Sequence, residues 1–164
     1  MTGFDDLLAA NRRYAETFSL GGFDGVAHSG VAMVTCMDSR IDPLGLLGLQ
    51  PGDAKIFRNP GGRVTEAALE ALVLGVHLLN VKRILVVPHT RCAMASSTLE
   101  QLRERVSASA GQDASWQSFG VVPDQKSALL DDVHKVRAHP LIPATVEVGG
   151  FLYDVDTGLL SQLA

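Results

Sequence analysis

The sequence predicts a single α/β domain over residues 1–164, with a mostly parallel central sheet flanked by helices and an N-terminal helical arm. Three observations support this prediction. Short runs rich in valine, isoleucine and leucine alternate with longer segments of helical periodicity. A length of 164 residues fits one domain and leaves no room for a second of ordinary size. A hydrophobic fraction of 46% with 20% charged residues is that of a globular protein.

Residues 1–20 predict an amphipathic helix. Apolar side chains recur there at nearly helical spacing, with charged residues between them. The apolar positions are Phe4, Leu7, Leu8, Tyr14 and Phe18. A glycine-rich segment, residues 21–25, ends the pattern. We expect this arm to pack on another subunit.

Three short apolar runs predict buried strands, and they are Val31–Thr35, Lys55–Phe57 and Arg83–Val87. Between the second and third runs, residues 66–79 carry an apolar stripe at helical spacing, and Thr65 is a suitable N-cap for that helix. Strand, helix and strand in this order indicate a parallel sheet.

The second half continues the alternation of helices and strands. Thr98–Val106 predicts a charged, exposed helix, and Gly111–Asp124 predicts a loop. Apolar positions within residues 129–136 predict another helix. Thr145–Val155 predicts a late strand, and the turn residues Asp156–Gly158 indicate that it continues into a hairpin.

Composition and charge exclude several kinds of partner. A net charge of -4 without a cluster of lysines or arginines argues against nucleic acid, and an aromatic fraction of 5% argues against stacked bases. The apolar run Ala67–Leu79 is interrupted by Glu70 and is too short to span a membrane. The start of the chain has no apolar core of a secretory signal, so we expect a cytoplasmic protein.

The first chemically dense motif is Cys36-Met37-Asp38-Ser39-Arg40. If the strand stays extended past its cysteine, residues 36, 38 and 40 share one face because side chains alternate. A thiolate, a carboxylate and a guanidinium would then point into one crevice. The pentapeptide alone leaves a second interpretation open, a buried cysteine followed by a surface ion pair.

The second motif is His89-Thr90-Arg91-Cys92. Residues three apart in a turn can present two donor atoms to one ion, and histidine nitrogen and cysteine sulfur are standard zinc donors. We expect Cys92 to lie at the start of a helix, where the dipole lowers a thiol pKa. On its own, H-x-x-C is a weak indication of a metal.

Both motifs follow predicted parallel strands, and the carboxyl ends of such strands are where sites form in open α/β sheets. Two cysteines and one histidine make three ligands, one fewer than a closed structural zinc site, which indicates an open position for water. A disulfide between Cys36 and Cys92 is the alternative in an oxidising compartment. We favour thiolates, because each cysteine lies within a dense motif.

Cys36-x-Asp38-x-Arg40 followed by His89-x-x-Cys92 resembles the zinc signature of the β-class carbonic anhydrase family. Three further segments are similar to the family, namely Gly48–Asp53, Arg58–Gly62 and Val148–Gly158. The resemblance covers nearly the whole chain, whose length is similar to that of the short prokaryotic members.

The resemblance implies one Zn2+ held by Cys36, His89 and Cys92. Asp38 and Arg40 would be the catalytic pair in the reversible hydration of CO2 to bicarbonate and a proton by zinc-bound hydroxide. Two resting states stay open: a closed one, in which Asp38 is the fourth ligand at lower pH and returns to Arg40 as the pH rises, and one in which water stays on zinc at all pH values. The resemblance also implies a homodimer or a higher multiple of dimers. Because two thiolates already neutralise the dication, we expect the water pKa to be raised and the activity to increase with pH.

Two other functions remain open. Proteins resembling this family hydrolyse COS or CS2 with the same ligands, so the signature alone does not separate these substrates from CO2. A zinc-binding paralogue without catalysis is the second alternative. The intact pair of Asp38 and Arg40 argues against it, because metal binding alone does not require that pair.

The chain departs from the family pattern beside the ligands. Members commonly read H-T-D-C-G-M, whereas this chain has Arg91 in place of the acid and Ala93 in place of the glycine. If that glycine served a left-handed backbone, alanine would cost about 1–2 kcal/mol. Neither change touches a ligand, so both bear on substrate choice and turnover.

We expect the residues outside the two motifs to have supporting or packing roles. Arg58 follows the second predicted strand and is a candidate contact around the ligands. Trp116 and Phe119 are expected to pack rather than to contact substrate. The remaining histidines are expected to take no part in the chemistry, and these are His28, His77, His134 and His139.

Overall fold

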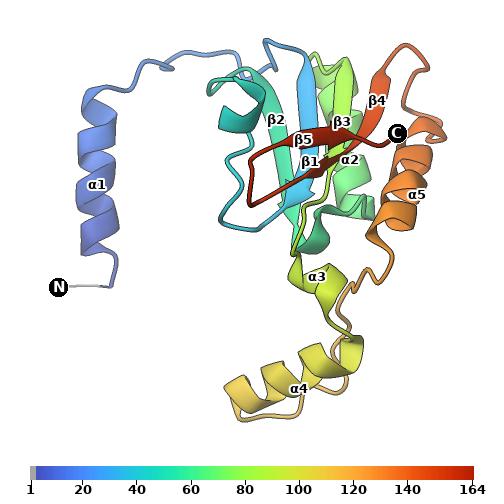
Figure 1. Cartoon of the computed structure of the whole chain (residues 1–164). Coiled ribbons are helices and arrows are strands. Elements are labelled where there is room, and N and C mark those ends of the chain that lie inside the picture. Colours follow the sequence, from blue (N-terminus) through green and yellow to red (C-terminus); the bar gives the residue numbers. More distant parts are fainter. Residues whose placement is uncertain (1–2) are drawn as a thin grey trace.

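A five-stranded sheet in the order β2-β1-β3-β4-β5 forms the centre of the molecule (Figure 1). The computed structural model describes residues 3–164. The first four strands run parallel, and β5 pairs antiparallel with β4. The strands are β1 (Val31–Cys36), β2 (Ala54–Asn59), β3 (Arg83–Val87), β4 (Glu147–Tyr153) and β5 (Leu160–Gln162). The predicted fold class and the late hairpin are confirmed.

A helix lies in each segment where the sequence predicts one, with ends that differ by up to four residues. They are α1 (Asp5–Glu16), α2 (Glu66–Leu78), α3 (Ala93–Ser96), α4 (Leu99–Ala110) and α5 (Gln125–Arg137), with short 3-10 helices η1 (Gly45–Leu47) and η2 (Pro60–Gly62). Side-chain oxygens of Thr65, Thr98 and Asp124 cap α2, α4 and α5 by accepting backbone N–H groups. The predicted N-cap at Thr65 is therefore confirmed.

The hydrophobic core is built around the central strands of the sheet. All six residues of β1 are buried, as expected of a central parallel strand that is covered on both faces. Helices α2 and α5 contribute apolar side chains to the same core. Its buried members include Val34, Val64, Ala68, Leu72, Ile84, Val86, Leu129, Val133 and Val136. This packing fixes the ends of β1 and β3, from which the site is built.

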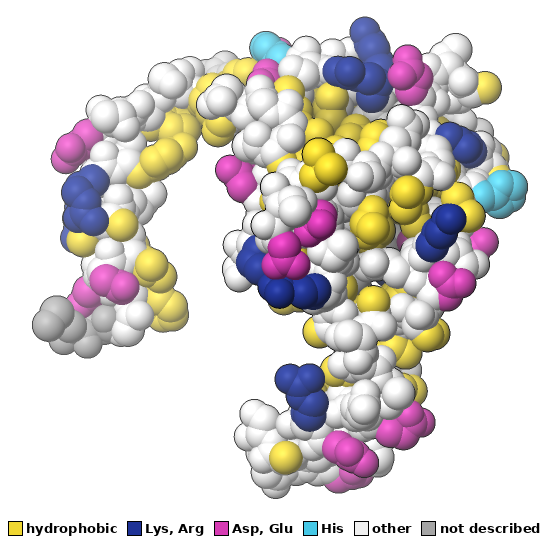
Figure 2. Space-filling model, viewed as in Figure 1, with side chains coloured by type: hydrophobic (Ala, Val, Ile, Leu, Met, Phe, Trp, Pro, Cys, Tyr) yellow, Lys and Arg dark blue, Asp and Glu magenta, His cyan; other side chains and the backbone are white. Residues whose placement is uncertain are grey.

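Helix α1 stands apart from the sheet (Figure 1) and is shorter than the predicted segment of residues 1–20. Residues 1–2 of that segment lie outside the described part of the chain. No residue between Asp5 and Glu16 is buried. Figure 2 shows hydrophobic side chains along this arm, many of them on the side turned toward the rest of the molecule. Within residues 3–164, no helix is long and apolar enough to cross a membrane.

Candidate metal centre

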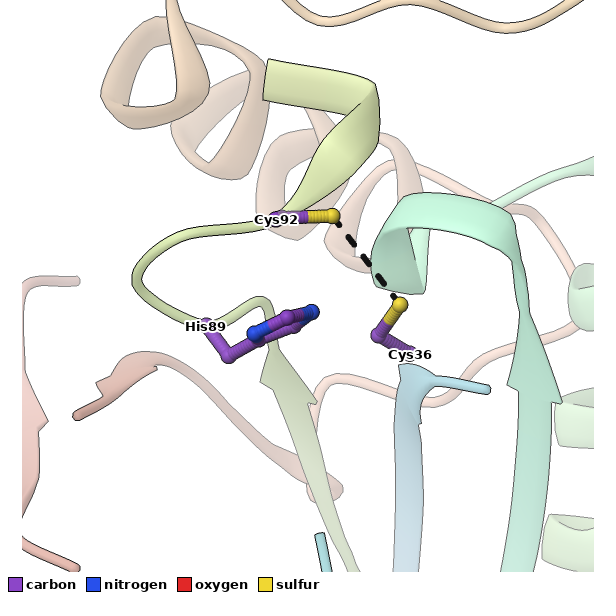
Figure 3. Close-up of side chains that lie close together, drawn as sticks. All are labelled: Cys36, His89 and Cys92. Atoms are coloured by element: carbon purple, nitrogen blue, oxygen red, sulfur yellow. Dashed lines mark hydrogen bonds between the residues drawn. The ribbon is translucent and has the colours of Figure 1, made fainter. Parts of the chain in front are cut away.

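Three metal-donor side chains meet at the carboxyl ends of β1 and β3 (Figure 3). Cys36 is the last residue of β1, and His89 and Cys92 lie in the segment that follows β3. Because β1 and β3 are adjacent and parallel, both ends reach the same edge of the sheet. The Sγ atoms and a ring nitrogen of His89 all lie within 4.8 Å of one another. The structure thus brings together the three ligands that the sequence predicts.

The two thiols are free, buried and close enough to share a proton, with 4.0 Å between the sulfurs. The hydrogen bond between the sulfurs, with smaller contributions from His89 and the Gly61 N–H, lowers the pKa of Cys36. The same bond and burial raise the pKa of Cys92. Cys92 precedes α3 as expected, but the expected lowering of its pKa by the helix start is wrong for the metal-free pair. Backbone N–H groups of α3 do favour its thiolate, but the neighbouring sulfur has the larger effect.

His89 is oriented for metal binding. Its side chain is fully buried, and Nδ1 lies 2.8 Å from the carbonyl oxygen of Thr90, which fixes the ring. Nε2 has no hydrogen-bond partner among the described residues. Burial lowers the pKa of His89, while the Cys36 thiolate and the Asp38 carboxylate raise it by more. A buried, unpaired nitrogen beside two sulfurs fits a zinc ion well.

Asp38 and Arg40 form a two-bonded ion pair beside this cluster. Arg40 Nε donates to Asp38 Oδ1 at 2.9 Å, and Nη2 donates to Oδ2 at 2.7 Å. These bonds hold the pKa of Asp38 well below its usual range. Oδ2 also lies 3.8 Å from Nε2 of His89. The carboxylate is therefore adjacent to the metal donors while bound to Arg40.

Asp38 and Arg40 come together through a turn, whereas the sequence predicts an extended strand past Cys36. Strand β1 ends at Cys36, and the chain turns at Ser39 and Arg40 instead of staying extended. The Arg40 backbone N–H donates to Asp38 Oδ1 at 3.0 Å, which closes a local turn around the carboxylate. This turn, rather than strand alternation, aligns the pair.

Arg58 and Gly61 surround the Cys36 end of the site. Arg58 in β2 donates to the carbonyl oxygens of Cys36 and Asp38, at 2.9 and 2.5 Å. Gly61 donates its backbone N–H to the sulfur of Cys36 at 3.4 Å. The expected contact of Arg58 is confirmed. Apart from the adjacent glycines Gly61 and Gly62, nothing in the sequence indicated that Gly61 would donate to the Cys36 sulfur.

The two departures from the family pattern have different structural settings. Arg91 adopts a left-handed backbone (φ 53°), which a glycine, asparagine or aspartate tolerates better than an arginine. Its Nη1 lies 3.2 Å from Asp156 in the β4–β5 turn, and its carbonyl oxygen accepts from Arg40 at 3.4 Å. Ala93 begins α3 and has no positive φ, so the left-handed cost considered for it does not arise.

A cavity of about 630 Å³ opens over the donors. Residues 117–120 line this cavity, so Phe119 packs within its wall. A backbone bond from Val122 to the carbonyl oxygen of Met94, 2.7 Å long, ties this loop to α3. Trp116 does not line the cavity and is 77% exposed, so the expectation that it packs is wrong. The apolar part of the wall comprises Met37, Pro60, Ala93, Met94 and Phe119.

The other histidines lie outside the lining of this cavity. His28 pairs with Asp24 at 3.2 Å, and His77 Nε2 lies 2.7 Å from the carbonyl oxygen of Leu141. His134 lies on the exposed side of α5, and His139 follows the end of that helix.

Comparison with known proteins identifies the family. The sequence model of the family described as carbonic anhydrase matches residues 31–160. β-Carbonic anhydrase 1 of Mycobacterium tuberculosis is 30% identical over 163 residues, which cover 99% of each chain. The carbon disulfide hydrolase of Acidianus sp. is 34% identical over 154 residues, which cover 79% of this chain and 75% of that one.

A solved structure agrees with both the sequence match and the fold. The crystal structure of carbonic anhydrase from Streptococcus mutans superposes with a TM-score of 0.88 at 34% identity, covering 100% of this chain and 99% of that chain. The clustered cysteines and histidine are the donor set that such a zinc enzyme needs. The chain therefore belongs to the β-carbonic anhydrase family of zinc lyases.

Proposed function

We propose that the chain catalyses the reversible hydration of CO2 to bicarbonate and a proton. The observation that carries this proposal is the two-bonded pair of Asp38 and Arg40 directly beside three clustered metal donors. The relatives named as carbonic anhydrases, which align over nearly the whole chain, support it. Stopped-flow CO2 hydration by the zinc-loaded protein is the direct test.

In this proposal Cys36, His89 and Cys92 hold one Zn2+, and three protein donors leave one of four positions for water. The metal would supply the acidity that makes this water a nucleophile near neutral pH. Asp38 accepts a hydrogen bond from the nucleophile, and Arg40 keeps the carboxylate in place through its two donors. The apolar wall of the cavity suits CO2, which is small and uncharged.

Hydrolysis of CS2 or COS is the second candidate. A relative named carbon disulfide hydrolase is 34% identical, and the apolar wall would accept CS2 as well as CO2. We favour CO2, because the named β-carbonic anhydrase aligns over 99% of both chains, against 79% and 75% for that hydrolase. A zinc-binding paralogue without catalysis leaves the pairing of Asp38 with Arg40 unexplained.

One zinc-loaded preparation assayed with CO2, COS and CS2 is expected to give the highest kcat/KM with CO2. Asp38→Asn is the matched control, because the proposed nucleophile is common to all three reactions and the variant should slow each of them. A higher kcat/KM for COS or CS2 than for CO2 would reassign the substrate while leaving the metal site unchanged.

We further propose a single domain whose α1 arm packs on a second copy of the chain, giving a dimer or a multiple of dimers. The arm exposes a row of large apolar side chains, namely Phe4, Leu7, Leu8, Tyr14 and Phe18. Burying one such side chain stabilises an interface by about 1.5–3 kcal/mol. A cytoplasmic location also fits, since a reducing compartment keeps both buried thiols free for metal.

Leu7→Asp combined with Leu8→Asp is expected to shift the protein toward monomers, because charges replace the apolar row at its centre. Multi-angle light scattering at micromolar concentration measures this shift. Arg13→Gln, on the polar side of the same helix, should leave the assembly unchanged. A wild-type protein that is monomeric, stable and active under these conditions would contradict the proposed packing of α1.

A further inference from the structure

One carboxylate is fully buried in the described part of the chain, and it lies outside the cavity. Asp132 on α5 is 1% exposed. Arg63 donates to it through Nε at 2.5 Å and Nη2 at 3.1 Å. The Val64 N–H donates at 3.0 Å, and Lys135 Nζ lies 3.5 Å away. A buried charge is tolerated when it is paired and hydrogen-bonded in this way, and the proposed CO2 chemistry makes no use of it.

Arg63 is held from a second side by Asn59. The Asn59 side chain accepts from the Arg63 N–H at 2.8 Å and donates to the Arg63 carbonyl oxygen at 2.7 Å. The main chain of Arg63 is thus fixed to the end of β2, while its guanidinium is fixed to α5 through Asp132. Between Asn59 and Arg63 lies the short turn Pro60–Gly62.

The Pro60–Gly62 turn packs directly against the backbone of β1 at Cys36. A Cβ on Gly62 would lie 3.0 Å from the backbone nitrogen of Cys36, and the turn uses positive φ at both Gly61 (83°) and Gly62 (66°). This close approach puts the Gly61 N–H 3.4 Å from the Cys36 sulfur. A small displacement of the turn would weaken that bond, because hydrogen bonds weaken steeply with distance and angle.

We propose that Asp132 is a positioning residue for the metal centre. By anchoring Arg63, it fixes the turn so that the Gly61 N–H donates to the Cys36 sulfur. The inference rests on the proposed function, in which Cys36 is a zinc ligand. Groups that hydrogen-bond a ligand orient it and tune its donor strength, and replacing them typically costs about 10- to 100-fold in metal affinity or activity.

The test compares metal binding by full-length Asp132→Asn, Asp131→Asn and wild-type protein. Asp131 is the matched control, because it is the adjacent acid on the same helix but is exposed. Zinc affinity is measured by competition with a chelator, and the sulfur-to-cobalt charge-transfer band is recorded after Co2+ substitution. We expect Asp132→Asn to bind zinc about 10-fold more weakly, the low end of that range, because Asp132 acts on Cys36 only through Arg63 and the turn. Its cobalt band should move to longer wavelength, because a thiolate that loses an N–H donor holds its electrons less tightly.

The outcomes separate this inference from the proposed function. If wild type binds neither Zn2+ nor Co2+, both are overturned. If wild type binds them and Asp132→Asn lowers only the unfolding temperature, with zinc affinity and the cobalt band unchanged, Asp132 is purely structural. Should Asp132→Asn fail to fold, Arg63→Lys decides, because it keeps the charge but loses the two-bonded geometry. Arg63→Lys should show a smaller loss of zinc affinity and a smaller shift of the cobalt band. Unchanged metal binding in Arg63→Lys would overturn the inference.

Discussion

Replacing Arg40 by alanine is expected to lower kcat/KM for CO2 hydration by about 10²–10⁴-fold, the range of a lost acid–base group. Zinc content should stay near one per chain, because Arg40 touches none of the three donors directly. The activity should fall because Asp38 loses both guanidinium bonds and lies 3.8 Å from His89 Nε2. The freed carboxylate can then take the open ligand position and exclude water.

The same variant tests the proposed closed state. In wild type, Asp38 should leave the metal position for Arg40 as the pH rises through about 7.5–8.5, so that activity increases over that range. X-ray absorption of Arg40→Ala at about pH 6.5 and about pH 9 should show the carboxylate on zinc at both values. Arg83→Ala, an exposed arginine at the opposite end of the sheet, is the control and should behave as wild type. Activity near wild type in Arg40→Ala would refute both the switch and the role of Arg40.

Cys92→Ser is expected to lose most of the zinc. A serine hydroxyl is a harder and far less acidic donor than a thiol, so the site would keep only one strong sulfur ligand. Metal analysis after dialysis should fall from about one zinc per chain to less than about 0.2. Because a metal that binds only the folded state stabilises it by mass action, the unfolding temperature should also fall and should no longer respond to added zinc.

Ser96→Ala, in the short helix that follows Cys92, is the control for this experiment. Ser96 is exposed and contributes no donor to the cluster, so its variant should keep the metal. Wild-type protein with well under half a zinc per chain, and no recovery on adding zinc, would contradict the proposed metal site as a whole.

The sequence by itself predicted the main strands and helices and the three side chains that cluster as candidate metal donors. Val31–Thr35 and Arg83–Val87 are short, rich in β-branched residues and flanked on one side by Gly30 and Pro88, so local pattern alone identified them as buried strands. The predicted parallel topology then placed Cys36 and His89 close together, because adjacent parallel strands end at one edge of a sheet. These inferences succeeded because they depend on neighbours in the sequence and on one general rule of chain topology.

Only the tertiary structure decided which groups surround those donors. The position of Phe119 in the cavity wall depends on how a loop without periodicity folds back over α3. The hydrogen bond between Cys36 and Cys92 depends on a distance of 4.0 Å between two sulfurs that are remote in the sequence. The contact of Asp132 with Arg63 joins α5 to a turn far away in the chain. Such contacts are set by packing between remote segments, and no local pattern of residues encodes them.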